Sequence, residues 1–281
     1  MAEAGRIGLP AAPAPWIDPV TALRIGIITG VLAFWEALAR SGLLYRDVVP
    51  SLVAIGGALD KLLWTPLWVM LTTGDPAELL STNSFYWNLW VTAGEVGTAL
   101  MIGGVSGVVV GLVLGGSRLL SKAYEPYLYY LGPTPKIIFF PVMIMWFGVG
   151  PGSKVAMGAI SCFFPIALST AAGMRQIDKV LIKVGRSFRA NAWQMATKIY
   201  LPAMRHPMIN GVRLGLGVAI IGTLLAETKL SNRGVGFLII QAYSLFDMPR
   251  MYAMLIVLFV VAIGANALVG RLGGLSTIRQ R

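Results

Sequence analysis

Six stretches of about twenty mostly apolar residues constrain the fold of this chain more than any other feature. A helix needs about 20 such residues to cross the hydrocarbon core of a bilayer. Only 12% of the 281 residues are charged, roughly half the fraction of a soluble domain. The pattern predicts an all-α, polytopic membrane protein with about six transmembrane helices and excludes a soluble enzyme. The predicted spans are residues 22–39, 89–116, 124–149, 155–174, 208–226 and 251–270.

One further apolar segment, residues 48–71, is interrupted by Asp60, Lys61 and Pro66. These interruptions favour helices that lie in the membrane interface, with a seventh span as the alternative. Residues 22–80 are therefore expected to hold the first transmembrane helix and a periplasmic interfacial segment. The proline-rich residues 1–21 lack a signal-peptide pattern, and we expect them to form a cytoplasmic N-terminal segment.

The charges orient the predicted spans. Within residues 175–206 the only acidic residue is Asp178, whereas lysines and arginines are frequent. Since cytoplasmic loops carry an excess of Lys and Arg, this loop is placed in the cytoplasm. The tail, residues 271–281, contains three arginines and no acid, so both termini are predicted to be cytoplasmic in a bacterial inner membrane. This distribution accounts for much of the net charge of +11 without a nucleic-acid partner.

The sequence contains no pattern typical of a catalytic, metal-binding or nucleotide-binding site. A single cysteine, Cys162, and a single histidine, His206, leave no disulfide framework, zinc cluster or Ser/His/Asp arrangement. Residues 148–154 superficially resemble a phosphate-binding loop. However, Ser153 replaces the required glycine, and Val155 replaces the hydroxyl residue that would bind magnesium. We therefore predict no catalytic residue, no metal, no cofactor and no nucleotide site in this chain.

Two patterns inside the spans carry alternative interpretations. Gly103, Gly107, Gly111 and Gly115 recur every four residues, a spacing that lets two helix backbones approach closely in lipid. Packing within one subunit is favoured over a role in the permeation path.

The predicted third span contains four prolines, which free backbone carbonyls, so it is either a bent packing helix or an element beside a pathway. The four prolines are Pro126, Pro133, Pro135 and Pro141.

Intramembrane carboxylates are costly and suggest function, although Glu36 and Glu95 lie near span ends and could instead reach the interface. The candidate pathway residues are Glu95, Pro141 and Glu227.

The cytoplasmic stretch 180–202 has an amphipathic pattern. Val184, Phe188, Met195 and Ile199 recur at helical intervals. Two short helices are expected, with a break near Asn191 and a stop at Pro202. Composition alone leaves two roles open for these helices. They either lie on the membrane surface, held by anionic lipid, or dock onto a partner protein.

The end of this stretch resembles the EAA loop of ABC-importer permeases, which closes in Ile-x-Leu-Pro. Ile199, Leu201 and Pro202 stand at that spacing. Counting back, Arg189 occupies the family's Gly position and Lys183 its Glu position. The resemblance thus implies the docking fold, but this chain lacks the acid and the glycine of the family's usual salt bridge and turn.

In the family this loop forms coupling helices that dock in a groove of the ATPase subunit. Val184 and Gly185 occupy its two Ala positions. The resemblance assigns ATPase coupling to Lys183, Gly185, Phe188, Arg189, Ala192, Trp193, Ile199, Leu201 and Pro202.

Further motifs extend the resemblance to residues 30–270, in the order found in permeases of the nitrate/sulfonate/taurine group. They include a Pro-Ser segment at residues 50–51, a Trp-Phe-Gly-x-Gly stretch at 146–150 and a Ser-Lys pair at 153–154. A Glu-x3-Ser-x2-Gly-x-Gly-aromatic segment begins at Glu227. The resemblance implies a type I ABC importer permease fold, with its transmembrane domain over residues 85–270 and its coupling loop at 175–206.

The implied function is that of a transmembrane permease subunit of an ATP-driven importer for a small anion such as nitrate, a sulfonate or taurine. Its implied partners are ATP-binding subunits, a second copy of the permease, a periplasmic substrate-binding protein and membrane lipid. A stand-alone secondary transporter is the alternative, but it would need deep coupling carboxylates and usually inverted repeats. A membrane scaffold without transport would not need the coupling-type loop.

Overall fold

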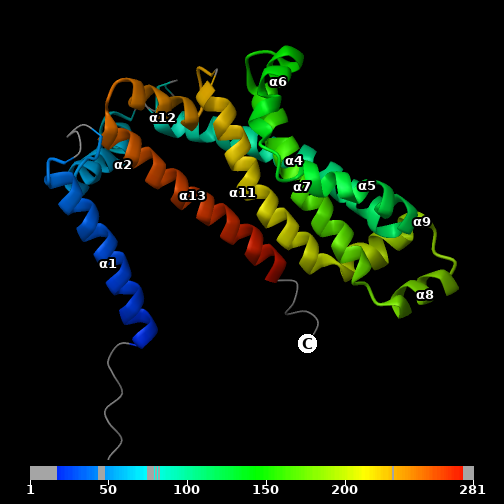
Figure 1. Cartoon of the computed structure of the whole chain (residues 1–281). Helices are drawn as coiled ribbons and strands as arrows, with labels where there is room; N and C mark the ends of the chain where they lie inside the picture. Colours follow the sequence, from blue (N-terminus) through cyan, green and yellow to red (C-terminus); the bar gives the residue numbers. More distant parts are fainter. Residues whose placement is uncertain are drawn as a thin grey trace, which may run out of the picture. The chain divides into compact units, whose positions relative to one another are not determined.

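The computed structural model describes residues 18–43, 48–74, 79, 81, 83–229 and 231–274. Every regular element within these ranges is helical, which confirms the predicted all-α fold (Figure 1). The chain divides into two units, residues 1–54 and 55–281, and each is described by itself. The predicted cytoplasmic segments 1–21 and 271–281 lie largely outside the described residues.

In the first unit, α1 spans Pro19–Arg40 and is exposed from Pro19 to Phe34, whereas its last turns are partly covered. Glu36 sits near its end and accepts hydrogen bonds from Arg40 Nε at 2.6 Å and from the backbone N–H of Leu52 at 2.8 Å. Leu52 is the first residue of α2, Leu52–Thr73. A carboxylate at the start of a helix stabilises its unpaired N–H groups, so Glu36 has a local structural role in fixing the turn after α1.

Helix α2 is a single helix of 22 residues and not the set of shorter interfacial helices that the sequence suggested. The helix continues through Pro66, which lies within its residue range. Its length and apolar composition meet the requirement for a membrane span. Its location in the interface therefore stays a prediction, and a seventh span remains the alternative.

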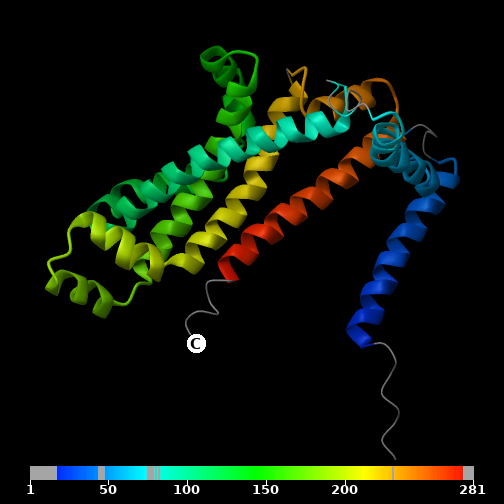
Figure 2. The ribbon, with the colours of Figure 1, turned by 180° about the vertical axis from the view of Figure 1, so that it is seen from behind.

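Three long helices form the body of the second unit, and they lie side by side in both views (Figures 1 and 2). They are α4, Phe85–Gly116; α7, Pro151–Arg175; and α11, Arg205–Lys229. Helix α7 lies between the other two and packs along both. It can do so because small residues such as Ala159, Ala167 and Ala171 fill its buried faces.

Helices α4 and α7 run parallel to each other. Gly103 lies against Ala159 near the beginning of α7, and Gly115 lies against Met174 near its end. Two parallel helices that both cross a membrane require the intervening chain to return to the starting side. The segment between α4 and α7 must therefore be the returning element.

That returning segment is a bent pair and not the single span predicted at residues 124–149. Its first part is α5, Arg118–Leu131. Its second part consists of η1, Lys136–Phe139, and α6, Phe140–Phe147. The two parts are bent by 93° relative to each other. The physical reason lies in Pro133 and Pro135, which cannot donate the hydrogen bonds that would continue α5.

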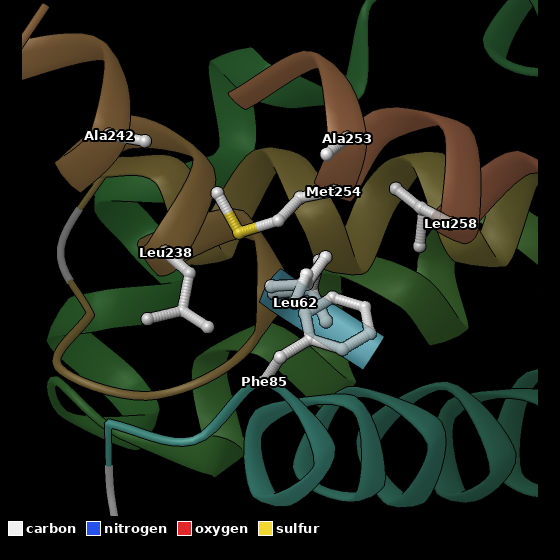
Figure 3. Close-up of a cluster of buried hydrophobic side chains, with 8 residues drawn as sticks. Leu62, Phe85, Leu238, Ala242, Ala253, Met254 and Leu258 are labelled. Atoms are coloured by element: carbon white, nitrogen blue, oxygen red, sulfur yellow. The ribbon is translucent and has the colours of Figure 1, made fainter. Parts of the chain in front are cut away.

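The remaining helices are α12, Val235–Ser244, and α13, Met248–Gly274. Helix α13 runs antiparallel to α11. This follows from the contact of Arg213, near the start of α11, which donates to Asn266, near the end of α13, at 3.0 Å. Figure 3 shows the core where α2, α4, α12 and α13 meet. Its buried side chains are Leu62, Phe85, Val235, Leu238, Ala242, Ala253, Met254 and Leu258.

Within the described ranges, six single helices are long and apolar enough to span a membrane, or up to seven spans if the bent pair counts as one. The predicted number of about six is confirmed, but its membership differs. Helix α2 qualifies, whereas the predicted third span qualifies only as a bent pair. The coupling stretch, described next, lies at the end of the body opposite α12 (Figures 1 and 2).

Candidate functional site: a coupling segment, a buried polar network and a mid-span cavity

The coupling segment, defined as residues 179–203, begins with α8, Lys179–Ser187. Asp178 caps this helix by accepting a hydrogen bond from the N–H of Val180 at 2.8 Å. An aspartate at this position satisfies one of the free N–H groups of the first turn, so the only acid in the loop has a structural task.

A tight turn separates α8 from the second half of the segment. Arg189 has a φ of 53°, in the left-handed region that ordinary side chains rarely adopt. The N–H of Ala190 then donates to the carbonyl of Gly185 at 3.0 Å, which closes the end of α8. Arg189 occupies the family's Gly position, so this chain keeps the glycine-type turn with a non-glycine residue. The loss of the glycine does not abolish the turn.

Asn191 starts the second helical stretch through a capping box. Its side chain accepts from the N–H of Gln194 at 2.8 Å, and the Gln194 side chain accepts from the N–H of Asn191 at 3.0 Å. Two otherwise unpaired donors are thereby satisfied by one pair of residues. The predicted break near Asn191 therefore coincides with the observed helix start.

The helical stretch that follows ends at Ala203, one residue beyond the predicted stop at Pro202. Helix α9, Ala192–Gln194, passes into η2, a π-helical turn at Met195–Tyr200, and then into α10, Leu201–Ala203. Pro202 lies in α10, where the missing proline N–H requires no acceptor in the first turn. The helical path is interrupted only at Met204, before α11.

The residues predicted to couple to an ATPase divide into two groups. Gly185 is buried, and a Cβ placed on it would lie 2.2 Å from Ile199 Cδ1 and 2.6 Å from Met195 Sδ. This close approach packs α8 onto η2, while Leu201 packs on the small core around Met204. Gly185, Ile199 and Leu201 therefore hold the segment together.

The second group faces outward. Phe188 is 83% exposed and Trp193 is 75% exposed, which is unusual for two large aromatic side chains placed on either side of one turn. The other exposed members are Lys183, Arg189, Ala192 and Pro202. An exposed aromatic pair surrounded by cations is a surface suited to contact with another molecule.

The body of the second unit carries this segment rigidly. Arg175, the last residue of α7, donates to both carboxylate oxygens of Glu125 on α5, at 2.5 and 2.6 Å. Ser121 also donates to Glu125. A bidentate guanidinium–carboxylate pair fixes orientation as well as distance, so α5 and the end of α7 are held together just before the coupling segment begins.

A buried polar network lies at the opposite end of the body. Glu227, near the end of α11, accepts from Thr92 Oγ1 on α4 and from the N–H of Gly236 on α12, both at 2.7 Å. The Thr92 oxygen in turn accepts from the N–H of Val235 at 2.9 Å. Gly234 has a φ of 101°, and a Cβ there would lie 2.3 Å from the Glu227 carboxyl. Only glycine fits this position.

Glu95 is buried beside this network. It forms an ion pair with Lys154 of α7 at 3.1 Å, and both side chains are almost completely enclosed. Lys154 also donates to the carbonyl of Arg233 at 3.3 Å. Removing one partner of such a pair leaves an uncompensated buried charge, so the pair ties α4, α7 and the loop before α12 together.

The three candidate pathway residues are thus only partly brought together. Glu95 and Glu227 share the polar end of the body, whereas Pro141 lies exposed in the first turn of α6. The sequence placed Glu95 in the second span and Glu227 just after the fifth, but it did not reveal that both bind neighbouring helices. Their role in a pathway stays a prediction.

The glycine stripe on α4 faces α7. A Cβ on Gly103 would lie 2.3 Å from the Ala159 carbonyl, and one on Gly111 would lie 2.5 Å from Thr170 Cβ. Gly107 and Gly115 meet α7 in the same way. The absent side chains are what allow the two backbones to approach.

Sequence reasoning singled out Pro133 and Pro135 but did not reveal that they line a 620 Å³ cavity between the bend after α5, the middle of α7 and α11. Lys136 is the charged residue in its lining, and a cation within an apolar span is the signal that could have identified it. In the described part of the chain, no group of three or more His, Cys, Asp or Glu side chains could hold a metal ion.

Comparison with known proteins identifies the family. The family model "Binding-protein-dependent transport system inner membrane component" matches residues 107–275, more than half of the chain. The chain belongs to this family. It is a multi-pass inner-membrane permease subunit of an ATP-driven importer, it is not itself an enzyme, and it works with an ATP-binding subunit and a substrate-binding protein.

Individual relatives resemble this permease over most of their length. A Bacillus subtilis (strain 168) protein assigned to aliphatic sulfonates transport is 27% identical over 231 residues, 82% of this chain and 78% of its own. The taurine transport system permease of Escherichia coli (strain K12) is 26% identical over 254 residues, 89% of this chain and 88% of its own. The riboflavin transport system permease of Chloroflexus aurantiacus is 33% identical over 155 residues, 55% of this chain and 58% of its own.

Proposed function

We propose that this permease forms a homodimer which imports a small anion, and that residues 179–203 dock in a groove of the ATP-binding subunit. The exposed aromatic pair Phe188 and Trp193 is the observation that carries the docking role. Lipid contact alone would not require a left-handed residue, a capping box and close packing between α8 and η2. A partner with a shaped groove would require all three, because each fixes the relative orientation of the two helices.

The direction of the helices supports a cytoplasmic position for the coupling segment. Parallel α4 and α7 both end on the side of this segment, and the antiparallel pair α11 and α13 brings residue 271 back to that side. The same side carries the exposed cations Arg118, Lys122, Lys183 and Arg186. With α2 at the interface and the bent pair as one span, the chain crosses six times and both termini are cytoplasmic.

The position of α2 decides this topology and can be measured. Single cysteines at Ser41 and Gly74 flank α2, and a membrane-impermeant thiol reagent applied to intact cells reports the side of each. Cys162 is fully buried, so the unmodified chain serves as the blank. We expect both cysteines to react from outside, as for an interfacial helix. Reaction at one end only would show that α2 spans the membrane and that the N-terminus is periplasmic.

The relatives support a sulfonate or comparable anion as the solute. The proteins assigned to aliphatic sulfonates and taurine transport align over 78% and 88% of their own length. The complete transporter with its binding protein should take up taurine, methanesulfonate or nitrate into proteoliposomes in an ATP-dependent manner. Uptake of riboflavin alone would overturn the anion assignment.

The docking role is tested by charge at the aromatic pair. Phe188→Asp and Trp193→Asp should each lower solute-stimulated ATP hydrolysis at least tenfold in the complete transporter, because a carboxylate cannot fill an apolar pocket. Ala192→Trp should act similarly by filling the space beside the turn. The matched variants Phe188→Leu and Trp193→Phe should retain most activity. Full activity in the Asp variants, with no crosslink from residue 188 to the ATPase, would leave a lipid-surface role.

A further inference from the structure

The cavity beside Lys136 lies at mid-depth in the second unit. Its α7 lining runs from Met157 to Ser169, the middle of a helix that spans Pro151–Arg175. Its α11 lining runs from Leu214 to Leu225, the middle of Arg205–Lys229. A position halfway along two membrane-spanning helices is beyond the reach of a lipid headgroup. A ligand there has to come through the protein.

The size and the lining suit a small organic solute. The cavity holds 620 Å³, within the range of about 300–1,000 Å³ typical of ligand pockets. Its walls are mostly apolar, with the Phe164 ring and the Ser161 and Ser169 hydroxyls among them. A few polar groups on an apolar wall are what orient a ligand without holding it tightly.

Lys136 is the one charged residue among the described residues that line this cavity. Its ammonium group donates to the carbonyl of Gly132 and lies 5.2 Å from the centre of the Phe164 ring. An ammonium group has three N–H donors, so these contacts leave donors for a further acceptor. None of the carboxylates in the described part of the chain forms an ion pair with it.

Lys154 differs from Lys136 in having a carboxylate partner. Lys154 is also a cation within a span, and Glu95 compensates its charge at 3.1 Å. Intramembrane cations are costly and are usually paired in this way. Lys136 has a ring face and a carbonyl in place of a carboxylate, so its charge is available to an anion that enters the cavity.

We propose that Lys136 is the anion-recognising residue of the solute pathway, contacting the sulfonate or equivalent oxyanion of the solute at mid-membrane. This inference rests on the proposed import of an anion and adds the site at which the anion is recognised. Lys136 stands at the bend between α5 and α6, so a change in that bend would move the ammonium group relative to α7 and α11.

The first experiment separates charge from helix capping. Lys136→Gln keeps an N–H donor for the Gly132 carbonyl but removes the charge, and Lys136→Arg keeps both. In proteoliposomes with the complete transporter, Lys136→Gln should lower taurine and methanesulfonate uptake at least tenfold. Lys136→Arg should retain at least a third of it. The control Lys122→Gln removes an exposed cation of α5 outside the cavity and should leave uptake unchanged.

The yield of assembled complex and the uptake by the wild-type transporter keep the outcomes distinct. The yield should match wild type in Lys136→Gln, because the capping donor remains. If the wild-type transporter imports none of the anionic probes, the proposed substrate class fails, and this site fails with it. If wild type imports them and Lys136→Gln does so equally well, only the Lys136 assignment is overturned.

A second variant tests whether an anion reaches the site. Ser169→Cys, in the lining of the same cavity, keeps Lys136. It should react with a sulfonate-bearing methanethiosulfonate reagent in the assembled transporter, and taurine with binding protein and ATP should slow the reaction at least threefold. The wild-type chain provides the blank, since Cys162 is fully buried. Absence of reaction would show that lipid or the second copy covers the cavity and would overturn the proposal.

Discussion

The polar network of the helical body and the coupling segment place their side chains in opposite ways. In the network, Glu95, Lys154 and Glu227 are buried, and each binds a group on another helix. In the coupling segment, Phe188 and Trp193 lie exposed on either side of one turn. Charged groups inside and aromatic groups outside reverse the usual arrangement of a soluble protein. The body is therefore held by polar contacts, and the segment is left available for contact.

This difference indicates which part of the chain can receive movement from the ATP-binding subunit and which part resists rearrangement. The body has close glycine contacts and buried hydrogen bonds that resist local rearrangement. The coupling segment follows α7, whose last residue Arg175 is paired with Glu125 of α5, and it leads into α11 after Met204. Force applied to the segment is thus transmitted to two whole helices, which is the geometry that a rigid-body transition requires.

The largest expected effect comes from breaking the network. Glu227→Ala removes the acceptor for Thr92 Oγ1 and for the Gly236 N–H, both buried. Each buried donor left unsatisfied costs about 1–3 kcal/mol. We expect a clearly lower thermal unfolding temperature of the purified complex in detergent. Glu227→Gln keeps an acceptor oxygen and should lose less. Equal unfolding temperatures for Glu227→Ala and wild type would contradict a structural role for the network.

The next effect concerns packing within the body. Gly111→Leu would force a branched side chain into Thr170 and the Ala167 carbonyl, both within 3 Å of the added Cβ. Overpacking of this kind costs about 1–3 kcal/mol, and Gly107→Leu should behave alike. The matched control is Gly97→Leu on the same helix, where an added Cβ meets nothing within 4 Å. Size-exclusion yield of the complex measures the effect. Normal assembly of Gly111→Leu would place the stripe in a looser interface.

A smaller effect is expected in the coupling segment at the left-handed residue. Arg189→Gly should preserve ATP coupling and protect the 185–191 amides better against hydrogen exchange, because glycine adopts this backbone without strain. Arg189→Val loses the same charge but introduces a β-branched residue, for which a positive φ is an outlier. Its amides should exchange faster. Identical exchange in the two variants would show that the backbone conformation at residue 189 does not limit the segment.

The smallest effect belongs to an exposed charge. Lys183 stands at the family's Glu position, so its docking surface is expected to carry compensating acidic groups. Exposed ion pairs contribute about 0.2–1 kcal/mol, so Lys183→Glu should weaken solute-stimulated ATP hydrolysis by less than roughly fivefold. The deficit should shrink as salt is raised, because salt screens exposed charges. A complete loss, or a deficit independent of salt, would mean that Lys183 is enclosed by the partner.

Much of this architecture could be predicted from the sequence because it depends on local pattern. Apolar length gave the helices and their approximate number, and the order of short motifs gave the family. The pairing of Glu95 with Lys154 could not be predicted, since the two residues are 59 positions apart and meet only when α4 packs on α7. The same holds for Lys136, whose significance depends on a cavity formed by three separate segments.

The helix ends one residue beyond the predicted stop at Pro202, because the hydrogen bonding changes just before the proline. Proline disfavours the interior of an α-helix because it removes a donor, but that rule assumes α-helical hydrogen bonding. The chain adopts a π-helical turn over Met195–Tyr200 immediately before Pro202, and the proline then occupies the first turn of α10. A local sequence rule cannot anticipate a change in hydrogen-bonding register that tertiary packing stabilises.

That π-helical turn also sets the direction in which the coupling surface points. One residue in an α-helix corresponds to a rotation of about 100°, so a turn that accommodates an extra residue displaces everything before it around the helix axis. Trp193 and Ala192 precede η2, whereas Leu201 follows it. Deleting a single residue between 195 and 200 would leave every side chain of the exposed surface present, yet aim it at the wrong part of an ATPase groove. Angular phase, and not composition alone, decides whether this segment can engage its partner.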